Sequence, residues 1–209
     1  MTQLLKAGKA STERFSIEMP HRDACNAIYS AMKSIVELRG FEFRMDDKLK
    51  PLIQKAAEWL IDPNGKRGLL LCGLYGNGKT TMAKALGLLI SRLSELEFGF
   101  RERKIVRLLT TKEICRIFTT EPKEYENLFF EEFLIVDDLG HEPKEIMLYG
   151  MIHTPIIDLI CERYDRQLMT IITTNYEADQ IEKDYKSRVR DRLREMMDTI
   201  IFTNPSYRK

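Results

Sequence analysis

The sequence feature that most constrains the fold is a glycine-rich run between an uncharged stretch and an amphipathic one. Residues 68–72 are uncharged, and the chain continues as Gly73-Leu74-Tyr75-Gly76-Asn77-Gly78-Lys79-Thr80-Thr81. This run has the spacing G-x-x-x-x-G-K-T of a phosphate-binding loop, which requires a strand before it and a helix after it. Apolar residues then recur at helical spacing, as Met82, Leu86, Leu89 and Leu93. The sequence therefore predicts a strand, this loop and a helix in direct succession.

Such a loop binds phosphate because its glycines let several backbone N–H groups face one anion, and the following helix adds its positive end. We expect Lys79 to reach the β- and γ-phosphates and the Thr80 hydroxyl to ligate Mg²⁺. The alternative is a glycine-rich turn that matches by chance, but the strand and the helix that the motif requires are both present. The predicted ligands are ATP and Mg²⁺, and the predicted nucleotide-binding residues are Gly73, Gly76, Asn77, Gly78, Lys79, Thr80 and Thr81.

A second apolar run, Phe133–Val136, ends in two acids, Asp137 and Asp138. At a strand tip beside the phosphate-binding loop, Asp137 is expected to hold Mg²⁺ together with Thr80. Asp138 is then placed to polarise the attacking water. The alternative is a buried strand that simply ends in a polar turn, and the loop upstream makes that interpretation the weaker one.

Two further features concern the γ-phosphate. Thr173-Thr174-Asn175 ends another apolar run, so the Asn175 side chain can bridge the phosphate and a water, or can serve only in a turn. A helix predicted over Arg188–Met196 carries Arg188 and Arg192 four residues apart, hence on one face. One of these arginines can reach a nucleotide bound by a neighbouring subunit. The alternative is a solvated charged face paired with nearby acids.

Short apolar runs alternate with helical patterns along the rest of the chain, which predicts an α/β fold with a parallel sheet between two layers of helices. The predicted strands are Gly68–Cys72, Ile105–Leu109, Phe133–Val136, Thr170–Thr173 and Thr199–Phe202. The predicted helices between them are Lys79–Leu93, Thr111–Phe118, Thr154–Arg166 and Arg188–Met196.

Two amphipathic helices are predicted before the first strand, one over Asp23–Arg39 and one over Leu49–Leu60. We therefore expect a short N-terminal helical extension over residues 1–42 and an ATPase domain over residues 43–209. The apolar stripe of the first helix is too small to form a core of its own. It must be buried either on the ATPase domain or on another protein.

Composition narrows the remaining classes. The 209 residues carry 33 Lys and Arg against 32 Asp and Glu, a net charge of +1, so any nucleic-acid site must be a local patch. No run approaches the ~18 apolar residues of a membrane span, and the N-terminus has no apolar signal region. The 4 cysteines lie far apart, which favours neither a zinc site nor a disulfide framework. We expect a cytoplasmic protein with no membrane contact.

These motifs in this order, followed by SRVRDRLREM and a terminal PSYR, resemble the DnaC-type bacterial helicase loaders and the similar IstB-type transposition helper ATPases, both of the AAA+ superfamily. The resemblance covers residues 43–209. It implies that Lys79 and Thr80 are Walker A, Asp137 and Asp138 Walker B, Asn175 sensor 1 and Arg192 the arginine finger, with Arg188 as the alternative finger. Most AAA+ enzymes have Glu where Asp138 stands, and the usual C-terminal lid domain is not expected here.

The resemblance implies an ATPase that self-associates when ATP is bound, contacts single-stranded DNA and delivers a replicative helicase. A transposition helper ATPase and a small-molecule P-loop kinase are the alternatives. The candidate DNA surface combines cations with aromatic rings downstream, which can pair with phosphates and stack on bases; the rings can equally pack under the sheet. Its residues are Arg101, Arg103, Lys104, Arg107, Lys112, Arg116, Phe118, Tyr125, Phe129 and Phe130.

Overall fold

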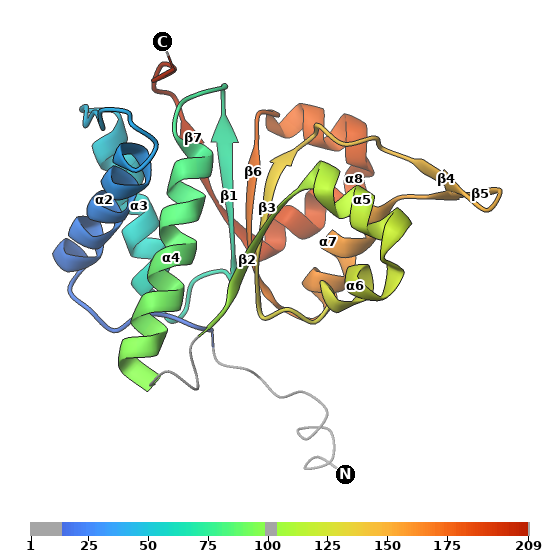
Figure 1. Cartoon of the computed structure of the whole chain (residues 1–209), viewed down its shortest axis with the longest axis horizontal. Helices are drawn as coiled ribbons and strands as arrows, with labels where there is room; N and C mark the ends of the chain where they lie inside the picture. The colour runs from blue at the N-terminus through green and yellow to red at the C-terminus, as the bar shows by residue number, and fades with distance from the viewer. Residues whose placement is uncertain (1–13, 99–103, 209) are drawn as a thin grey trace.

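A parallel sheet with helices on both faces forms the centre of the computed structural model, which describes residues 14–98 and 104–208 (Figure 1). The sheet has five strands in the order β2-β3-β6-β1-β7, and every neighbouring pair is parallel. The strands are β1 (Gly68–Gly73), β2 (Val106–Thr110), β3 (Phe133–Leu139), β6 (Met169–Thr174) and β7 (Met197–Phe202). The expected α/β sandwich with a five-stranded parallel sheet is confirmed.

Each face of the sheet is covered by its own set of helices, because alternate side chains along a strand point to opposite faces. Leu69 and Leu71 pack with the helices of the first face, whereas Leu70 packs with those of the second. The first face carries α2 (His21–Glu37), α3 (Leu49–Ile61) and α4 (Lys79–Phe98). The second carries α5 (Thr111–Thr120), α6 (Pro122–Asn127), α7 (Pro155–Asp165) and α8 (Ala178–Met196). Both faces of the sheet are therefore covered by helices, as the apolar runs of the strands predict.

Helix α2 is part of the first layer and contacts both α3 and α4. Its buried residues Ala24, Ile28, Ala31 and Met32 belong to the same apolar cluster as the core of those helices. The apolar stripe of this helix is thus buried against α3 and α4 of the same chain.

The structure departs from the sequence-based expectation on the second face of the sheet. Helix α8 begins at Ala178, ten residues before the expected start at Arg188, and α6 was not expected. A short antiparallel hairpin also appears between β3 and α7, formed by β4 (Ile146–Leu148) and β5 (Met151–His153). It projects from the side of the molecule opposite α2 and α3 (Figure 1).

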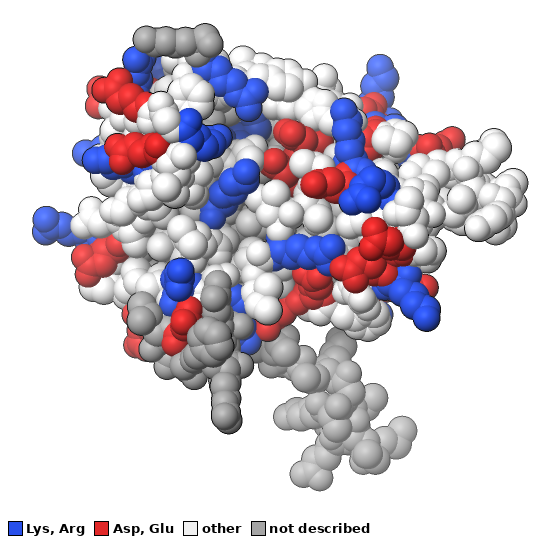
Figure 2. All heavy atoms as spheres, in the orientation of Figure 1, with Lys and Arg blue, Asp and Glu red and all other residues white. Residues whose placement is uncertain are grey.

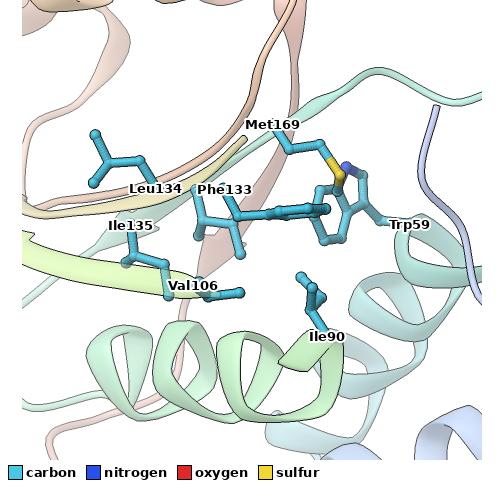
Figure 3. Close-up of a pocket in the computed structure, with 8 residues that line it drawn as sticks. Trp59, Ile90, Val106, Phe133, Leu134, Ile135 and Met169 are labelled. Atoms are coloured by element: carbon cyan, nitrogen blue, oxygen red, sulfur yellow. The ribbon is translucent and has the colours of Figure 1, made fainter. Parts of the chain in front are cut away.

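The core between α3, α4 and the sheet contains one small void of about 10 Å³ (Figure 3). Apolar side chains line it, among them Trp59, Ile90 and Phe133. A space of this size holds one water at most, and an apolar lining offers that water no partner. The void is a packing defect and no ligand site. Among the described helices, none is long and apolar enough to cross a bilayer.

Candidate nucleotide-binding site

The carboxyl ends of β1, β3 and β6 meet at one edge of the sheet, where a cleft of about 860 Å³ opens beside α2. Ligands of open α/β sheets bind at this edge. The predicted site residues that line the cleft are Gly76, Asn77, Gly78, Lys79, Thr80, Thr81, Asp137, Asp138 and Asn175. Gly73 lies at the start of the same loop. One cleft therefore collects residues from three separate parts of the chain.

The loop after β1 needs its glycines for two different reasons. Gly76 and Gly78 have φ angles of 75° and 102°, in the left-handed region that side chains disfavour. At Gly76 there is also no room, since a Cβ atom would lie 2.2 Å from the Ser206 hydroxyl oxygen. These positions let the loop curl and let the C-terminal residues approach its backbone.

Lys79 lies at the centre of the loop with only 5% of its surface exposed. Its ammonium donates to the Gly73 and Leu74 carbonyl oxygens at 2.8 and 2.7 Å. It also donates to the side-chain oxygens of Asn77 at 3.2 Å and Asn175 at 2.9 Å. Burial lowers the pKa of this ammonium, because a buried positive charge loses its hydration. All four hydrogen-bond acceptors are neutral oxygens, and the Asp137 and Asp138 carboxylates act on the charge only from a distance, so an anion such as a phosphate fits beside it.

Two hydroxyls converge on the buried Asp137 carboxylate at the tip of β3. Thr80 donates to Asp137 Oδ1 at 2.9 Å, and Thr173 donates to the same oxygen at 2.6 Å. Hydroxyl and carboxylate oxygens are the ligand type that Mg²⁺ prefers, with waters and substrate phosphates completing the shell. The described part of the chain holds no cluster of three or more His, Cys, Asp or Glu residues suited to a metal. A cation here would therefore depend on Thr80, Asp137 and the nucleotide itself.

Asp138 makes a turn inside β3, where the pairing of this strand with β6 shifts register, and its φ angle is 61°. Asp adopts this left-handed conformation more readily than most residues. The turn is fixed by the Asp138 N–H, which donates to the Thr173 hydroxyl at 2.9 Å. The half-exposed Asp138 carboxylate lines the cleft 3.9 Å from His141 Nδ1, and His141 Nε2 is hydrogen-bonded to the Tyr75 hydroxyl at 2.8 Å. The two adjacent acids thus differ in their surroundings. Asp137 is hydrogen-bonded to Thr80 and Thr173, whereas the Asp138 carboxylate faces the open cleft.

Asn175 follows β6 and completes the site. Its side-chain oxygen accepts from Lys79, while its buried Nδ2 has no hydrogen-bond partner among the described residues. A buried amide without a partner is uncommon and costs free energy, so it marks a place where a ligand oxygen would be accepted. This donor, the buried Lys79 charge and the Thr80–Asp137 oxygens together fit a magnesium nucleotide.

C-terminal residues also line this cleft, a position that the sequence did not predict. Tyr207 donates its N–H to the Gly76 carbonyl oxygen at 2.9 Å and its hydroxyl to Asp46 Oδ2 at 2.9 Å. Arg208 lies in the cleft lining, and Asn204 Nδ2 donates to the Asn77 carbonyl oxygen at 2.8 Å. The terminal PSYR run contributes to the family resemblance, but it does not predict that these residues lie beside the phosphate-binding loop.

Arg192 is not part of this chain's own cleft. Its guanidinium lies 5.0 Å from the centre of the Tyr164 ring and 3.5 Å from Asp165 Oδ1. The side chain of Arg188, the alternative finger, lies outside the described residues. Within one chain, therefore, Lys79, Asp137, Asp138 and Asn175 are brought together and Arg192 is kept apart from them.

Several residues of the expected DNA surface are engaged in contacts within the chain itself. Arg101 and Arg103 lie outside the described residues, and Lys104 and Arg107 are each paired with acids of the chain itself. The pairs are Lys104 with Glu132, and Arg107 with Glu124 and Glu131. Tyr125 is buried, so its ring is not available for stacking on a base.

Comparison with known proteins gives a structural match only. No family profile matches the chain, and no curated protein matches by sequence. The DnaC helicase loader has a TM-score of 0.58 at 19% identity, with 84% of this chain and 98% of that chain covered. DnaI has a TM-score of 0.54 at 21% identity, with 92% and 96% covered. Domain III of the Thermotoga maritima replication initiation protein DnaA has a TM-score of 0.54 at 15% identity, with 78% and 66% covered.

The strand order, the loop after β1 and the two acids near the end of β3 give the chain a five-stranded α/β fold with a phosphate-binding loop. This fold is similar to that of the DnaC and DnaI helicase loaders and of DnaA. After β7 the described residues 203–208 form no helical domain.

Proposed function

We propose that this chain binds and hydrolyses Mg²⁺-ATP in the cytoplasm as an AAA+ ATPase of the helicase-loader type. The observation that carries the proposal is the convergence of Lys79, the Thr80–Asp137 pair and the unpartnered Asn175 amide at one edge of the sheet. The likeness to DnaC and DnaI supports the same conclusion at the level of fold. One solved relative of similar fold, DnaA from Aquifex aeolicus with a TM-score of 0.50, is described as bound to AMPPCP.

The residues divide the work as their surroundings suggest. The Lys79 ammonium replaces its hydrogen bonds to the loop oxygens with hydrogen bonds to phosphate oxygens, and its positive charge stabilises the bound phosphates. Thr80 and Asp137 hold Mg²⁺, which neutralises phosphate charge when bound. Asp138 orients and polarises the attacking water from the open side of the cleft, and its carboxylate is one methylene shorter than the Glu of most AAA+ enzymes. Asn175 donates its free amide to the γ-phosphate or to that water.

The arginine finger is proposed to act between subunits. Arg192 lies on the α7–α8 side and not in its own cleft, so it can complete a site only on a neighbouring copy. We therefore propose that the chain forms a homo-oligomer in its ATP-bound state. A finger of this kind stabilises the transition-state charge and accounts for about 10³–10⁵ in turnover.

Nucleotide binding is tested by equilibrium titration of the full chain with a fluorescent ATP analogue. Lys79→Ala removes charge-assisted hydrogen bonds worth about 1.5–3 kcal/mol each, so losing two of them predicts affinity about 100-fold or more lower. Lys55→Ala, which removes an exposed lysine of α3, is the matched control and should bind as the wild type does. Equal affinity of Lys79→Ala and the wild type would refute the site.

The partner is tested separately. We propose a replicative helicase and single-stranded DNA as partners, so the chain with ATP should increase helicase placement on a closed single-stranded DNA circle. A chain that instead stimulates a transposase is a transposition helper. Transfer of the γ-phosphate to a small molecule, without release of free phosphate, would identify a kinase.

A further inference from the structure

The β4–β5 hairpin is an exposed apolar arm. Four of its side chains are exposed, namely Met147 at 74%, Tyr149 at 93%, Met151 at 61% and Ile152 at 62%. Residues 146–152 include no charged residue. In Figure 2 the arm stands out on the right as a projection of uncoloured spheres. Contiguous exposed apolar surface of this kind marks an interaction site in a folded protein.

The arm is held in a defined shape. Its strands pair Ile146 with His153 and Met147 with Ile152, and the turn at Tyr149 and Gly150 uses φ angles of 51° and 78°. Such left-handed turns match the twist of a two-stranded hairpin.

The base of the arm is fixed by a polar cluster around the buried Glu142 and Tyr185 side chains. Lys144 donates to the Tyr185 hydroxyl at 2.8 Å and lies 3.6 Å from Asp184. The buried Glu142 accepts the Gly140 N–H at 2.9 Å and is also hydrogen-bonded to Tyr185. The hairpin is thus attached to the segment that follows Asp138 and to helix α8.

The chemistry of the arm favours a protein surface as its partner. Nucleic-acid backbones are bound through Lys and Arg, and residues 145–153 contain neither. An apolar counterpart is present on the same chain, around the mouth of the nucleotide cleft. The exposed apolar side chains there are Phe41 and Tyr75, which line the cleft, and Leu38, Met45 and Leu74, each of which adjoins a lining residue in sequence. Together the two groups hold nine of the thirteen large apolar side chains that are exposed in the described part of the chain.

The hairpin and the segment that follows α2 lie on opposite sides of the molecule, and Leu74 and Tyr75 follow β1, which lies between them. Leu38, Phe41 and Met45 follow α2, at the left of Figure 1, whereas the hairpin projects at the right. A surface that meets a different surface on the opposite side of an identical copy makes a head-to-tail contact, which can repeat from copy to copy. One contact of this kind would cover both apolar groups.

We propose that the β4–β5 hairpin of one copy packs against the cleft mouth of the next copy. Because β5 leads directly into α7, this contact brings the side of the chain that carries Arg192 toward the neighbour's nucleotide. The proposal rests on the ATP-dependent self-association proposed above and names the surfaces that produce it. Nucleotide in the cleft would strengthen the contact, since Phe41 and Tyr75 line both the cleft and its mouth.

Self-association is measured by sedimentation velocity with Mg²⁺ and a non-hydrolysable ATP analogue. Ile152→Lys should weaken association at least tenfold. Tyr149→Asn should do the same while keeping the turn, since Asn accepts a left-handed φ. Ile105→Lys, which changes an exposed apolar residue outside both groups, is the control and should associate as the wild type does. Unchanged association of both hairpin variants would overturn the proposal.

Contact between copies is read directly by cross-linking. One preparation carries Tyr149→Cys and the other Leu38→Cys, and the mixture is treated with a short bismaleimide alongside wild-type protein to measure the background from native cysteines. A cross-linked product that requires both variants and the nucleotide supports the proposal. Equal product when Ile105→Cys replaces Tyr149→Cys overturns it. A chain that binds and hydrolyses ATP but stays monomeric also overturns it, while the ATPase assignment stands.

Discussion

Helix α2 offers the sharpest quantitative prediction, because its contribution to stability can be worked out from its burial. Ile28 and Met32 are 0% and 1% exposed and pack with α3 and α4. Burying two such side chains stabilises the fold by about 1.5–3 kcal/mol each, or about 3–6 kcal/mol together. A domain of this kind is stable by about 5–15 kcal/mol in total. Residues 44–209 alone should therefore be less stable than the full chain by about 3–6 kcal/mol, a large part of that total.

Point substitutions test the same reasoning without truncation. Ile28→Ala should lower the free energy of unfolding by about 2–5 kcal/mol, since it leaves a cavity in a packed core. Lys33→Ala, on the exposed face of the same helix, should change it by less than about 0.5 kcal/mol. Both are measured by urea denaturation of the full chain. If Ile28→Ala lowers the free energy of unfolding by less than about 0.5 kcal/mol, or if the 44–209 fragment is as stable as the full chain, α2 is not packed as described. Its apolar face would then be buried on another protein.

Four further predictions concern the neighbouring subunit, the tail and helix α5. Arg192→Ala and Asp138→Asn should each lose turnover but recover part of it when mixed, and a mixture that stays inactive would make Arg192 structural. Tyr207→Phe should weaken ATP binding several-fold in an equilibrium titration, because the C-terminal residues lose the hydrogen bond from Tyr207 to Asp46. Unchanged affinity would show that these residues do not contribute to binding. Thr110→Ala should cost about 1 kcal/mol of stability, measured by urea denaturation, by removing the α5 cap. Hydrogen bonds from Thr110 lower the pKa of Glu113, so the destabilisation caused by Glu113→Gln should be largest near neutral pH and should fade as the pH falls below the usual Glu pKa of about 4.3; a destabilisation that does not change with pH would contradict this.

The meeting of the candidate site residues in one cleft was predictable from sequence, because these residues follow or end strands whose carboxyl ends share one edge. The spacing from Gly73 to Thr80 is local, and Asp137 and Asn175 each end an uncharged run. Those patterns place the side chains at one edge without any knowledge of strand order. The contacts themselves, such as Lys79 with Asn175 across 96 residues, depend on β6 lying next to β1 and needed the structure.

Other elements were missed for identifiable reasons. The first half of α8 is highly charged, and its buried stripe of Ile181, Tyr185 and Val189 recurs every four residues, a signal that was present but weak. The hairpin has strands of only three residues, too short for an alternating pattern. The return of Tyr207 to Gly76 is a contact between distant parts of the chain, and nothing local in the sequence encodes it.

The central claim is that this cleft hydrolyses ATP and that Asp138 acts in the chemical step. The most direct test measures nucleotide affinity and phosphate release on the same samples of wild type and Asp138→Asn, with Mg²⁺ present. Water polarisation is needed only in the transition state, so the substitution should lower turnover and leave binding nearly unchanged. We expect affinities within about threefold of each other and phosphate release lower by about 100-fold or more in Asp138→Asn. Equal phosphate release by the two proteins, or loss of binding in Asp138→Asn, would contradict the account.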